Sequence, residues 1–178
     1  MTPLPPAYAW LATEPGPRML KELLKLHGVK ETLGPGNNPE ILSWAKEVGV
    51  PYPADEIAWC GLAVAIAARR ASWEFAPRGN PLWARNWAHW GEPGDVAMLG
   101  DVLVFPRGSG AHVAIYVGED GDAYHILGGN QRDQVSFMRK PKTPILAIRR
   151  APWKHIQPKN VRRVTLSAGG APMSSKED

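Results

Sequence analysis

Cysteine is almost absent from this 178-residue chain, which contains only Cys60. A single thiol cannot close an internal disulfide, so the chain is not a disulfide-stabilised secreted scaffold. One cysteine and five histidines, scattered along the sequence, give no set with metal-ligand spacing, and we expect neither a metal nor another cofactor. The glycines of "GPGNNP" lack the Lys-Ser or Lys-Thr pair that a phosphate-binding loop requires.

Long apolar runs are absent as well. No stretch approaches the roughly 20 apolar residues that a transmembrane helix needs, so we expect no membrane span. The first ten residues, "MTPLPPAYAW", contain neither a basic segment nor a continuous apolar segment, and they do not resemble a signal peptide. We therefore expect a protein that is made in the cytoplasm and that depends on another system to reach any site outside it.

Positive charge is only in slight excess. The 21 Lys and Arg exceed the 17 Asp and Glu by four, and the densest basic positions are pairs such as Arg69-Arg70 and Arg149-Arg150. A nucleic-acid-binding surface usually carries a concentrated basic stripe instead. We therefore expect no nucleic-acid partner.

Length and composition predict one folded domain. At 178 residues, 44% hydrophobic and 21% charged, the chain can bury a single core. Residues 1–16 are rich in proline and predict an extended arm. Periodicity is lost after residue 153, so residues 154–178 predict a flexible tail, and the folded domain spans residues 17–153.

Helices are predicted first along the chain. Residues 17–28 and 38–49 each begin with or next to a proline and end at a glycine, which is typical of a helix start and stop. A third helix is predicted from near Asp55 or Ile57 to about Ser72. Its small and branched apolar residues predict a buried central helix.

A fourth helix is predicted from Asn80, where "NPLWARNWAHWG" begins. Trp83, Trp87 and Trp90 would share one face of it. Such a stripe favours packing against the core, and an aromatic wall beside a substrate groove is the alternative.

Strands are predicted from Asp101 onward, where the hydrophobic period changes to two. The runs "DVLVFP", "AHVAIYVG", "DAYHILGG", "QVSFMR" and "ILAIRR" are separated by short turns. Helices followed by short antiparallel strands indicate an α+β fold, with the N-terminal helices packed on a curled antiparallel sheet of about five to six strands.

Cys60 is a candidate nucleophile. If its helix starts just before it, the unpaired backbone N–H groups and the positive end of the helix dipole favour the thiolate. The same N–H groups can stabilise an oxyanion. A buried core residue is the equally weighted alternative, because free cysteine is among the most buried residue types.

His112 is the candidate base, because it opens a predicted strand beside the turn "RGSG". A third residue must hold the imidazole in the correct tautomer. Asn130 in "GGNQ" and His125 in "AYHILGG" are the two candidates. On a regular strand they would point to opposite faces, because they are five positions apart and this offset is odd.

The ordered blocks "GPGNNPEIL", "WC", "WAHWG", "GDVLVF", "HVAIYVG" and "GGNQ" resemble the CHAP-type branch of the papain-like cysteine peptidases, which is related to the NlpC-type enzymes. The resemblance covers roughly residues 10–153. It implies a papain-like fold, with Cys60 as nucleophile, His112 as general base and Asn130 as third residue. Many CHAP enzymes carry Glu where this chain has Gly128, and in NlpC-type enzymes the third residue is a His near the position of His125.

The function implied by the resemblance is hydrolysis of an amide bond in the stem peptide of peptidoglycan, by an N-acetylmuramoyl-L-alanine amidase or a peptide endopeptidase. Such a protein would be a phage or prophage lysin or a wall-degrading effector, acting on the bacterial wall after release or delivery. We expect a monomer. The alternatives are a non-catalytic wall-binding or phage structural domain of the same fold, and a basic binding protein with a structural cysteine.

Overall fold

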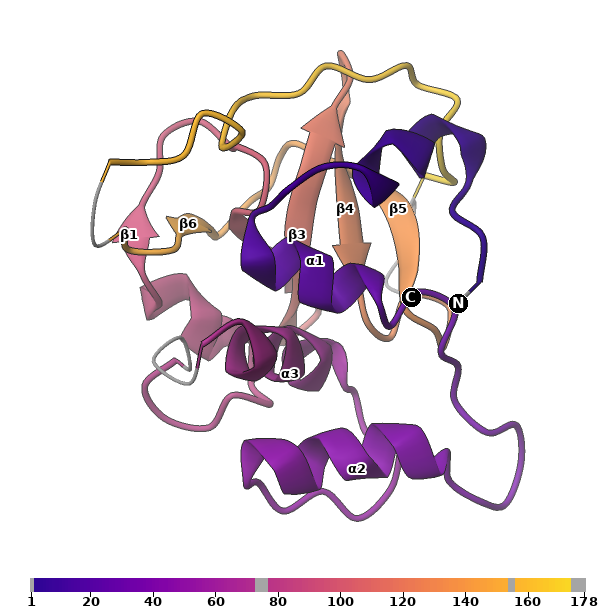
Figure 1. Ribbon diagram of the computed structural model, residues 1–178. Coiled ribbons are helices and arrows are strands. Elements are labelled where there is room, and N and C mark those ends of the chain that lie inside the picture. Colours follow the sequence, from indigo (N-terminus) through magenta and orange to yellow (C-terminus); the bar gives the residue numbers. More distant parts are fainter. Residues whose placement is uncertain (1, 73–76, 154–155, 174–178) are drawn as a thin grey trace.

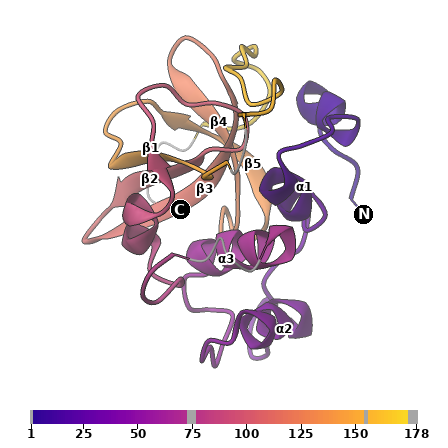
Figure 2. The same cartoon turned by 60° about the vertical axis from the view of Figure 1, so that its left-hand side comes forward.

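The computed structural model describes residues 2–72, 77–153 and 156–173. They form two layers, helices on one side and a single antiparallel sheet on the other (Figure 1 and Figure 2). The sheet has six strands in the order β1-β6-β2-β3-β4-β5. The predicted α+β class, with N-terminal helices on an antiparallel sheet, is confirmed.

The five predicted strands are all present. They are β2 (Val102–Arg107), β3 (Gly110–Glu119), β4 (Ala123–Gly128), β5 (Ser136–Pro141) and β6 (Ala147–Arg150). The short β1 (Glu92–Pro93), which pairs with β6, has no sequence signal because it is only two residues long. In the register of β2 and β3, His112 lies opposite Phe105.

Three α-helices follow one another along the chain: α1 (Arg18–Leu24), α2 (Pro39–Val48) and α3 (Cys60–Ala71). The boundaries of α2 are those predicted. The Asn38 side chain accepts the Glu40 N–H at 2.8 Å, and Gly49 ends the helix with φ 82°. Only glycine adopts such a left-handed conformation without strain.

Helix α3 lies at the centre of the molecule, in contact with α1, α2 and β3 (Figure 1). All of its residues except Arg69 and Arg70 are buried. Gly61 is required by close packing, because a Cβ there would lie 2.4 Å from the carbonyl oxygen of Leu82. The helix begins at Cys60, a few residues later than the predicted start near Asp55 or Ile57, so the thiol is on its first turn.

Strand alternation divides the side chains of β3 between two apolar clusters. Val113 and Ile115 belong to the main core beneath the helices, and Ala114 and Tyr116 belong to a smaller cluster on the opposite face. This period of two is the one that the sequence predicts. By the same alternation, His112 shares a face with Ala114 and Tyr116.

The N-terminal segment differs from the expected extended arm. Residues Pro6–Ala12 form the 3₁₀-helix η1, in which Tyr8 and Leu11 are fully buried. Tyr8 and Leu11 are three positions apart, so a 3₁₀-helix places both on one face. Tyr8 stacks on Phe137 of β5, with ring centroids 4.0 Å apart.

The predicted fourth helix is shorter than expected. It is the 3₁₀-helix η3 (Ala84–His89), and Asn80 instead caps a turn by accepting the Leu82 N–H at 3.0 Å. Trp87 is fully buried, whereas Trp83 is largely exposed. The prediction of one aromatic face is therefore wrong for Trp83, because the helix has not yet begun at that residue.

The C-terminal segment from residue 161 to residue 173 packs on the domain and is not a free tail. The Glu119 N–H donates to the Val164 carbonyl, and the Leu166 N–H donates to the Glu119 carbonyl, both at 2.8 Å. The Arg163 guanidinium pairs with the Glu119 carboxylate. Residues 154–155 and 174–178 of the predicted tail lie outside the described residues. No helix in the described ranges is both long and apolar enough to cross a membrane.

Candidate active site

Cys60 is the first residue of α3 and is only 2% exposed. Trp59 precedes it and is held by the Glu31 carboxylate, which accepts a hydrogen bond from the indole N–H. The Trp59 ring also packs against Trp44, with centroids 6.0 Å apart. The entry into α3 is therefore fixed by buried contacts, and the thiol has a defined position on the first turn.

Burial and backbone N–H groups have opposite effects on the Cys60 thiol. Burial has the larger effect and raises the pKa of the thiol. The pKa is lowered by hydrogen bonding from the Val113 N–H, by the charge of Arg107, and by the N–H groups of Gly61 and of Cys60 itself. The contact with Val113 is informative, because Val113 follows His112 on β3. The thiol of the helix thus lies beside the strand segment that carries the candidate base.

His112 is held by one hydrogen bond, between its Nε2 and the Oε1 of Gln131 at 3.1 Å. The amide nitrogen of Gln131 donates to the Ser136 carbonyl, which directs Oε1 toward the imidazole. Because a carbonyl oxygen only accepts, Nε2 must carry the ring proton. His112 Nδ1 therefore presents its lone pair.

The Nδ1 atom of His112 is buried and has no hydrogen-bond partner. Burial, followed by the charges of Lys140 and Arg107, lowers the pKa of His112 to about 3. The imidazole is thus a neutral base at neutral pH, and no hydrogen bond joins Nδ1 to the thiol. In unliganded enzymes such catalytic bonds are often long and tighten only when substrate binds.

Gln131, rather than Asn130, orients His112. Asn130 is the preceding residue and has a left-handed backbone, with φ 52°. Gly129 permits the close approach of this loop to α3, because a Cβ there would lie 2.4 Å from that of Ala63. The motif "GGNQ" contains two amides, and the sequence alone does not indicate which one a left-handed turn directs toward the base.

His125 lies in a separate cluster. Its Nε2 donates to Asp120 Oδ2 at 2.8 Å, and its Nδ1 accepts the Tyr8 hydroxyl at 2.6 Å. Arg139 also donates to Asp120 Oδ2, at 2.6 Å. Both ring nitrogens of His125 are occupied, and neither binds His112, so His125 does not orient the candidate base.

Arg107 is a residue that the sequence interpretation missed. Its charge acts on both Cys60 and His112. It is the last residue of β2, and alternation places it on the same face as Phe105, which lies opposite His112. The alternation in "VLVFPR" is the signal that could have identified it.

No group of three or more potential metal-ligating His, Cys, Asp or Glu side chains occurs within residues 2–72, 77–153 and 156–173. Comparison with known proteins gives no match to a family model, to a curated protein or to a solved structure.

Proposed function

We propose that the chain is a papain-like cysteine hydrolase that cleaves an amide bond, with Cys60 as nucleophile, His112 as base and Gln131 as the residue that orients the base. The observation that carries this proposal is the tautomer of His112. Gln131 holds the proton on Nε2 and leaves a buried lone pair on Nδ1, and the next residue, Val113, contacts the thiol.

In the first half of the proposed reaction, Nδ1 of His112 takes the thiol proton and Sγ attacks the carbonyl carbon of the amide. In this proposal, the backbone N–H groups of Cys60 and Gly61, which act on the Cys60 sulfur at the start of α3, stabilise the negative oxygen. The bond from carbon to nitrogen then breaks, and the imidazolium returns the proton to the leaving amine. A thioester on Cys60 remains.

In the second half, a water molecule attacks the thioester carbonyl carbon. His112 takes a proton from this water at Nδ1, the bond from carbon to Sγ breaks, and the proton passes to the thiolate. The products are a carboxylic acid and the original thiol. Throughout, Gln131 accepts the hydrogen bond from Nε2 and so stabilises the imidazolium.

The proposed substrate is the stem peptide of peptidoglycan. This part of the proposal is supported by the ordered motifs from "GPGNNPEIL" to "GGNQ", which resemble those of CHAP-type and NlpC-type wall hydrolases. A lysin or a wall-degrading effector would have this substrate.

Burial favours one alternative, a non-catalytic domain of the same fold that binds wall peptides. Cys60 and His112 are 2% and 4% exposed, and burial favours the neutral form of both groups. A binding domain requires no access to the thiol, whereas a hydrolase requires the substrate to reach it.

The test is digestion of purified sacculi by wild type and by Cys60→Ser, with the released fragments identified by mass spectrometry. The hydrolase proposal predicts fragments with a new amine and a new carboxylate from wild type, and none above background from the variant. Equal release by both proteins, or none by either, would contradict it. Binding to sacculi without release would favour the alternative.

A further inference from the structure

Four arginines of the described chain are half-buried: Arg107, Arg139, Arg149 and Arg150. Each of the last three binds a carboxylate or backbone carbonyl oxygens. Arg107 differs, because its guanidinium has neither a hydrogen bond nor an ion pair among the described residues. A half-buried cation without a partner costs free energy, because the surrounding water solvates it only in part.

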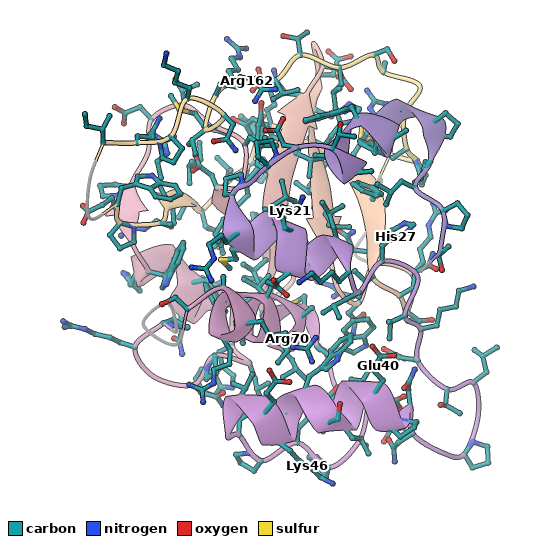
Figure 3. All side chains as sticks on the ribbon, viewed as in Figure 1. Lys21, His27, Glu40, Lys46, Arg70 and Arg162 are labelled. Atoms are coloured by element: carbon teal, nitrogen blue, oxygen red, sulfur yellow. The ribbon has the colours of Figure 1, made fainter. Side chains whose placement is uncertain are left out.

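Exposed arginines do not carry this cost, because water solvates them. Two of them, Arg70 and Arg162, are labelled in Figure 3, and even these bind Glu47 and Glu14. The half-buried position and the unpaired charge of Arg107 therefore favour an anionic ligand there.

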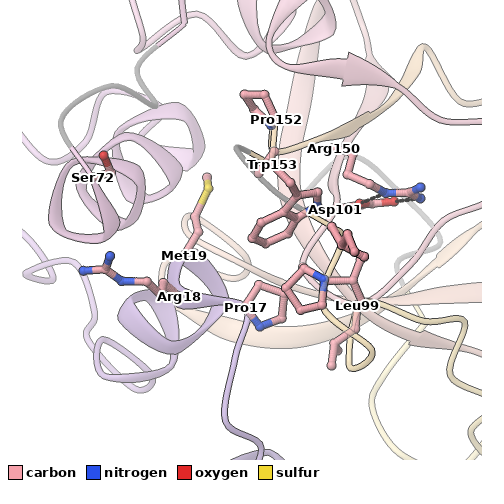
Figure 4. A pocket seen from close by; sticks show the side chains of 14 residues that line it. Pro17, Arg18, Met19, Ser72, Leu99, Asp101, Arg150, Pro152 and Trp153 are labelled. Carbon is pink, nitrogen blue, oxygen red and sulfur yellow. Dashed lines mark hydrogen bonds and ion pairs between the residues drawn. The ribbon is translucent and has the colours of Figure 1, made fainter.

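A cavity of about 660 Å³ at the C-terminal end of α3 is remote from the candidate site (Figure 4). Its lining is mainly apolar, and its Arg150 is paired with Asp101 at 2.7 Å. Ser72 in this lining is twelve residues beyond Cys60, so a rise of about 1.5 Å per residue separates it from the thiol by about 18 Å. Arg107, in contrast, is a neighbour of the candidate base.

Arg107 is the last residue of β2 and lies on the strand face that carries His112. Arg107 is opposite Gly110 in the register, and Phe105, two positions earlier, is opposite His112. Opposed residues of an antiparallel pair share a face, and diagonal neighbours have Cα atoms about 7–8 Å apart. Arg107 and His112 are such diagonal neighbours, so the long arginine side chain can reach the space beside the imidazole.

Gly110 leaves the face beside Arg107 open. Within 4 Å, a Cβ at Gly110 would meet only the carbonyl oxygen of Arg107, at 3.5 Å. The loop glycine Gly129 is the opposite case, because a Cβ there would lie 2.4 Å from that of Ala63. No side chain therefore stands opposite Arg107, and a group of a ligand can approach it there.

Two carboxylates near the start of α3 do not neutralise Arg107. Glu31 accepts a hydrogen bond from an indole N–H, and Asp55 accepts two from backbone N–H groups. The charge of Arg107 acts on both the Cys60 thiol and the His112 ring. A carboxylate bound to Arg107 would therefore lie close to both groups.

We propose that Arg107 binds a carboxylate of the peptide substrate, on a residue within about two positions of the amide that is cleaved. An extended peptide advances about 3.3 Å per residue, so about two residues span the distance of about 7–8 Å between Arg107 and His112. The guanidinium fork can hold a carboxylate by two parallel hydrogen bonds. The proposal rests on the proposed hydrolase function and specifies its substrate class, an acidic peptide.

The binding test uses a matched pair of peptides, acetyl-Ala-Glu-amide and acetyl-Ala-Gln-amide, each with its second residue in the L or the D form. The members of a pair differ by one carboxylate. Binding to Cys60→Ser, which lacks the proposed nucleophile, is followed by the NMR signal of the Gly110 N–H. We expect the glutamate peptide, in at least one form, to bind saturably and at least about tenfold more tightly than its glutamine counterpart, as charge-assisted hydrogen bonds predict.

Variants in the same Cys60→Ser protein assign the preference to Arg107. Arg107→Gln should bind both peptides equally, and Arg107→Lys, which keeps the charge but not the fork, should retain a smaller preference. Arg69→Gln is the matched control, because Arg69 is exposed and lies about 14 Å along α3 from Cys60. It should keep the full preference.

The binding results can overturn the proposal in several ways. No saturable binding, equal affinities for the two peptides in both forms, an unchanged preference in Arg107→Gln, or an equal loss in Arg69→Gln would each do so. Inorganic phosphate should bind no more tightly than the glutamine peptide. Phosphate binding as tight as that of the glutamate peptide would identify a general anion site and would also overturn the proposal.

An activity test separates this proposal from the hydrolase proposal. Its substrates are soluble stem peptides with their carboxylates either free or converted to carboxamides. Wild type should cleave the free acid with a kcat/KM at least about tenfold higher, and Arg107→Gln should lose this ratio. Both substrates meet the same thiol, so the ratio does not depend on any effect of Arg107 on Cys60.

The two proposals fail in different ways. Equal kcat/KM values for the two substrates in wild type would contradict the Arg107 proposal alone. Binding of the glutamate peptide that depends on Arg107, with no cleavage of either stem peptide, would contradict the hydrolase proposal alone.

Discussion

Two buried histidines on neighbouring strands, His112 on β3 and His125 on β4, differ in how their ring nitrogens are used. Both donate from Nε2, His112 to Gln131 and His125 to Asp120. The Nδ1 of His125 accepts the Tyr8 hydroxyl, whereas the Nδ1 of His112 has no partner. One ring is fully satisfied and the other retains a free lone pair.

Under the proposed function, this difference separates a structural role for His125 from a chemical role for His112. A buried polar atom without a partner costs free energy, and such atoms are rare in folded proteins. The fold tolerates this cost at His112, the residue before Val113, whose N–H contacts the Cys60 thiol. At His125 the same residue type connects η1, the β3–β4 turn and β5 through Tyr8, Asp120 and Arg139.

The largest expected effect comes from removing the free base. His112→Ala should lower amide hydrolysis by about 10² to 10⁴-fold, because general base catalysis contributes that much. The variant should unfold cooperatively in urea, since its ring makes only one hydrogen bond. Release of fragments from sacculi measures the rate. If His112→Ala has activity close to that of wild type, the free lone pair on His112 Nδ1 plays no part in the reaction.

Removing His125, whose ring nitrogens are both hydrogen-bonded, should lower stability and leave activity nearly unchanged. His125→Ala should lower the free energy of unfolding by about 2 to 4 kcal/mol, because it leaves the buried Tyr8 hydroxyl without a partner, removes one hydrogen bond from Asp120, which keeps Arg139, and leaves a cavity. Urea denaturation measures this loss. Activity per folded molecule should stay within about twofold of wild type. A specific loss of activity in a stably folded His125→Ala protein would instead make His125 the third residue.

A smaller effect is expected at the orienting amide. Gln131→Ala should lower kcat by about ten to a hundredfold, as expected for a misplaced catalytic group, and should alter the pH profile of kcat. Asn130→Gly is the matched control, because glycine adopts the left-handed φ of 52° at that position. A larger loss in the control than in Gln131→Ala would reverse the assignment of the third residue.

The smallest expected effect is on the pH dependence of stability. Burial lowers the pKa of folded His112 to about 3, below its unfolded value near 6.5. Between these pH values the unfolded chain binds a proton that the folded chain does not, so stability falls as the pH falls. The slope from this one group approaches about 1.4 kcal/mol per pH unit.

The slope that is due to His112 is the difference between the pH dependence of stability of wild type and that of His112→Gln. The variant retains the other buried groups, including His125, so their pH dependence is common to both proteins. Urea denaturation at several pH values between about 3 and 6.5 should give a flatter dependence for the variant. Parallel curves would mean that His112 is protonated in the folded protein and that its lone pair is not free.

Much of the fold could be predicted from the sequence, because local signals determine it. Asn38, Pro39 and Gly49 define α2, and the period of two in "AHVAIYVG" defines β3 and its two faces. The burial of Tyr8 could not be predicted. Its partners, His125 and Phe137, are more than a hundred residues away, and proline-rich sequence favours an extended chain.

The candidate site was predictable in part for the same reason. Cys60 and His112 are at the start of a helix and near the start of a strand, where apolar patterning is readable. Asn130 and Gln131 lie in a loop in which Asn130, Arg132 and Asp133 all have left-handed backbones. Such a loop has no regular alternation of side chains, so only the hydrogen bonds identify Gln131 as the partner of His112.

The most direct measurement of the central claim is alkylation of the native thiol by iodoacetamide, followed by intact mass. Cys60 is the only cysteine, so one adduct reports one site. If Nδ1 of His112 accepts the thiol proton, native wild type should be labelled faster than it unfolds, and His112→Ala should be labelled at least about tenfold more slowly. Labelling only after unfolding in urea, or equal rates in both proteins, would contradict the claim that Cys60 and His112 act together.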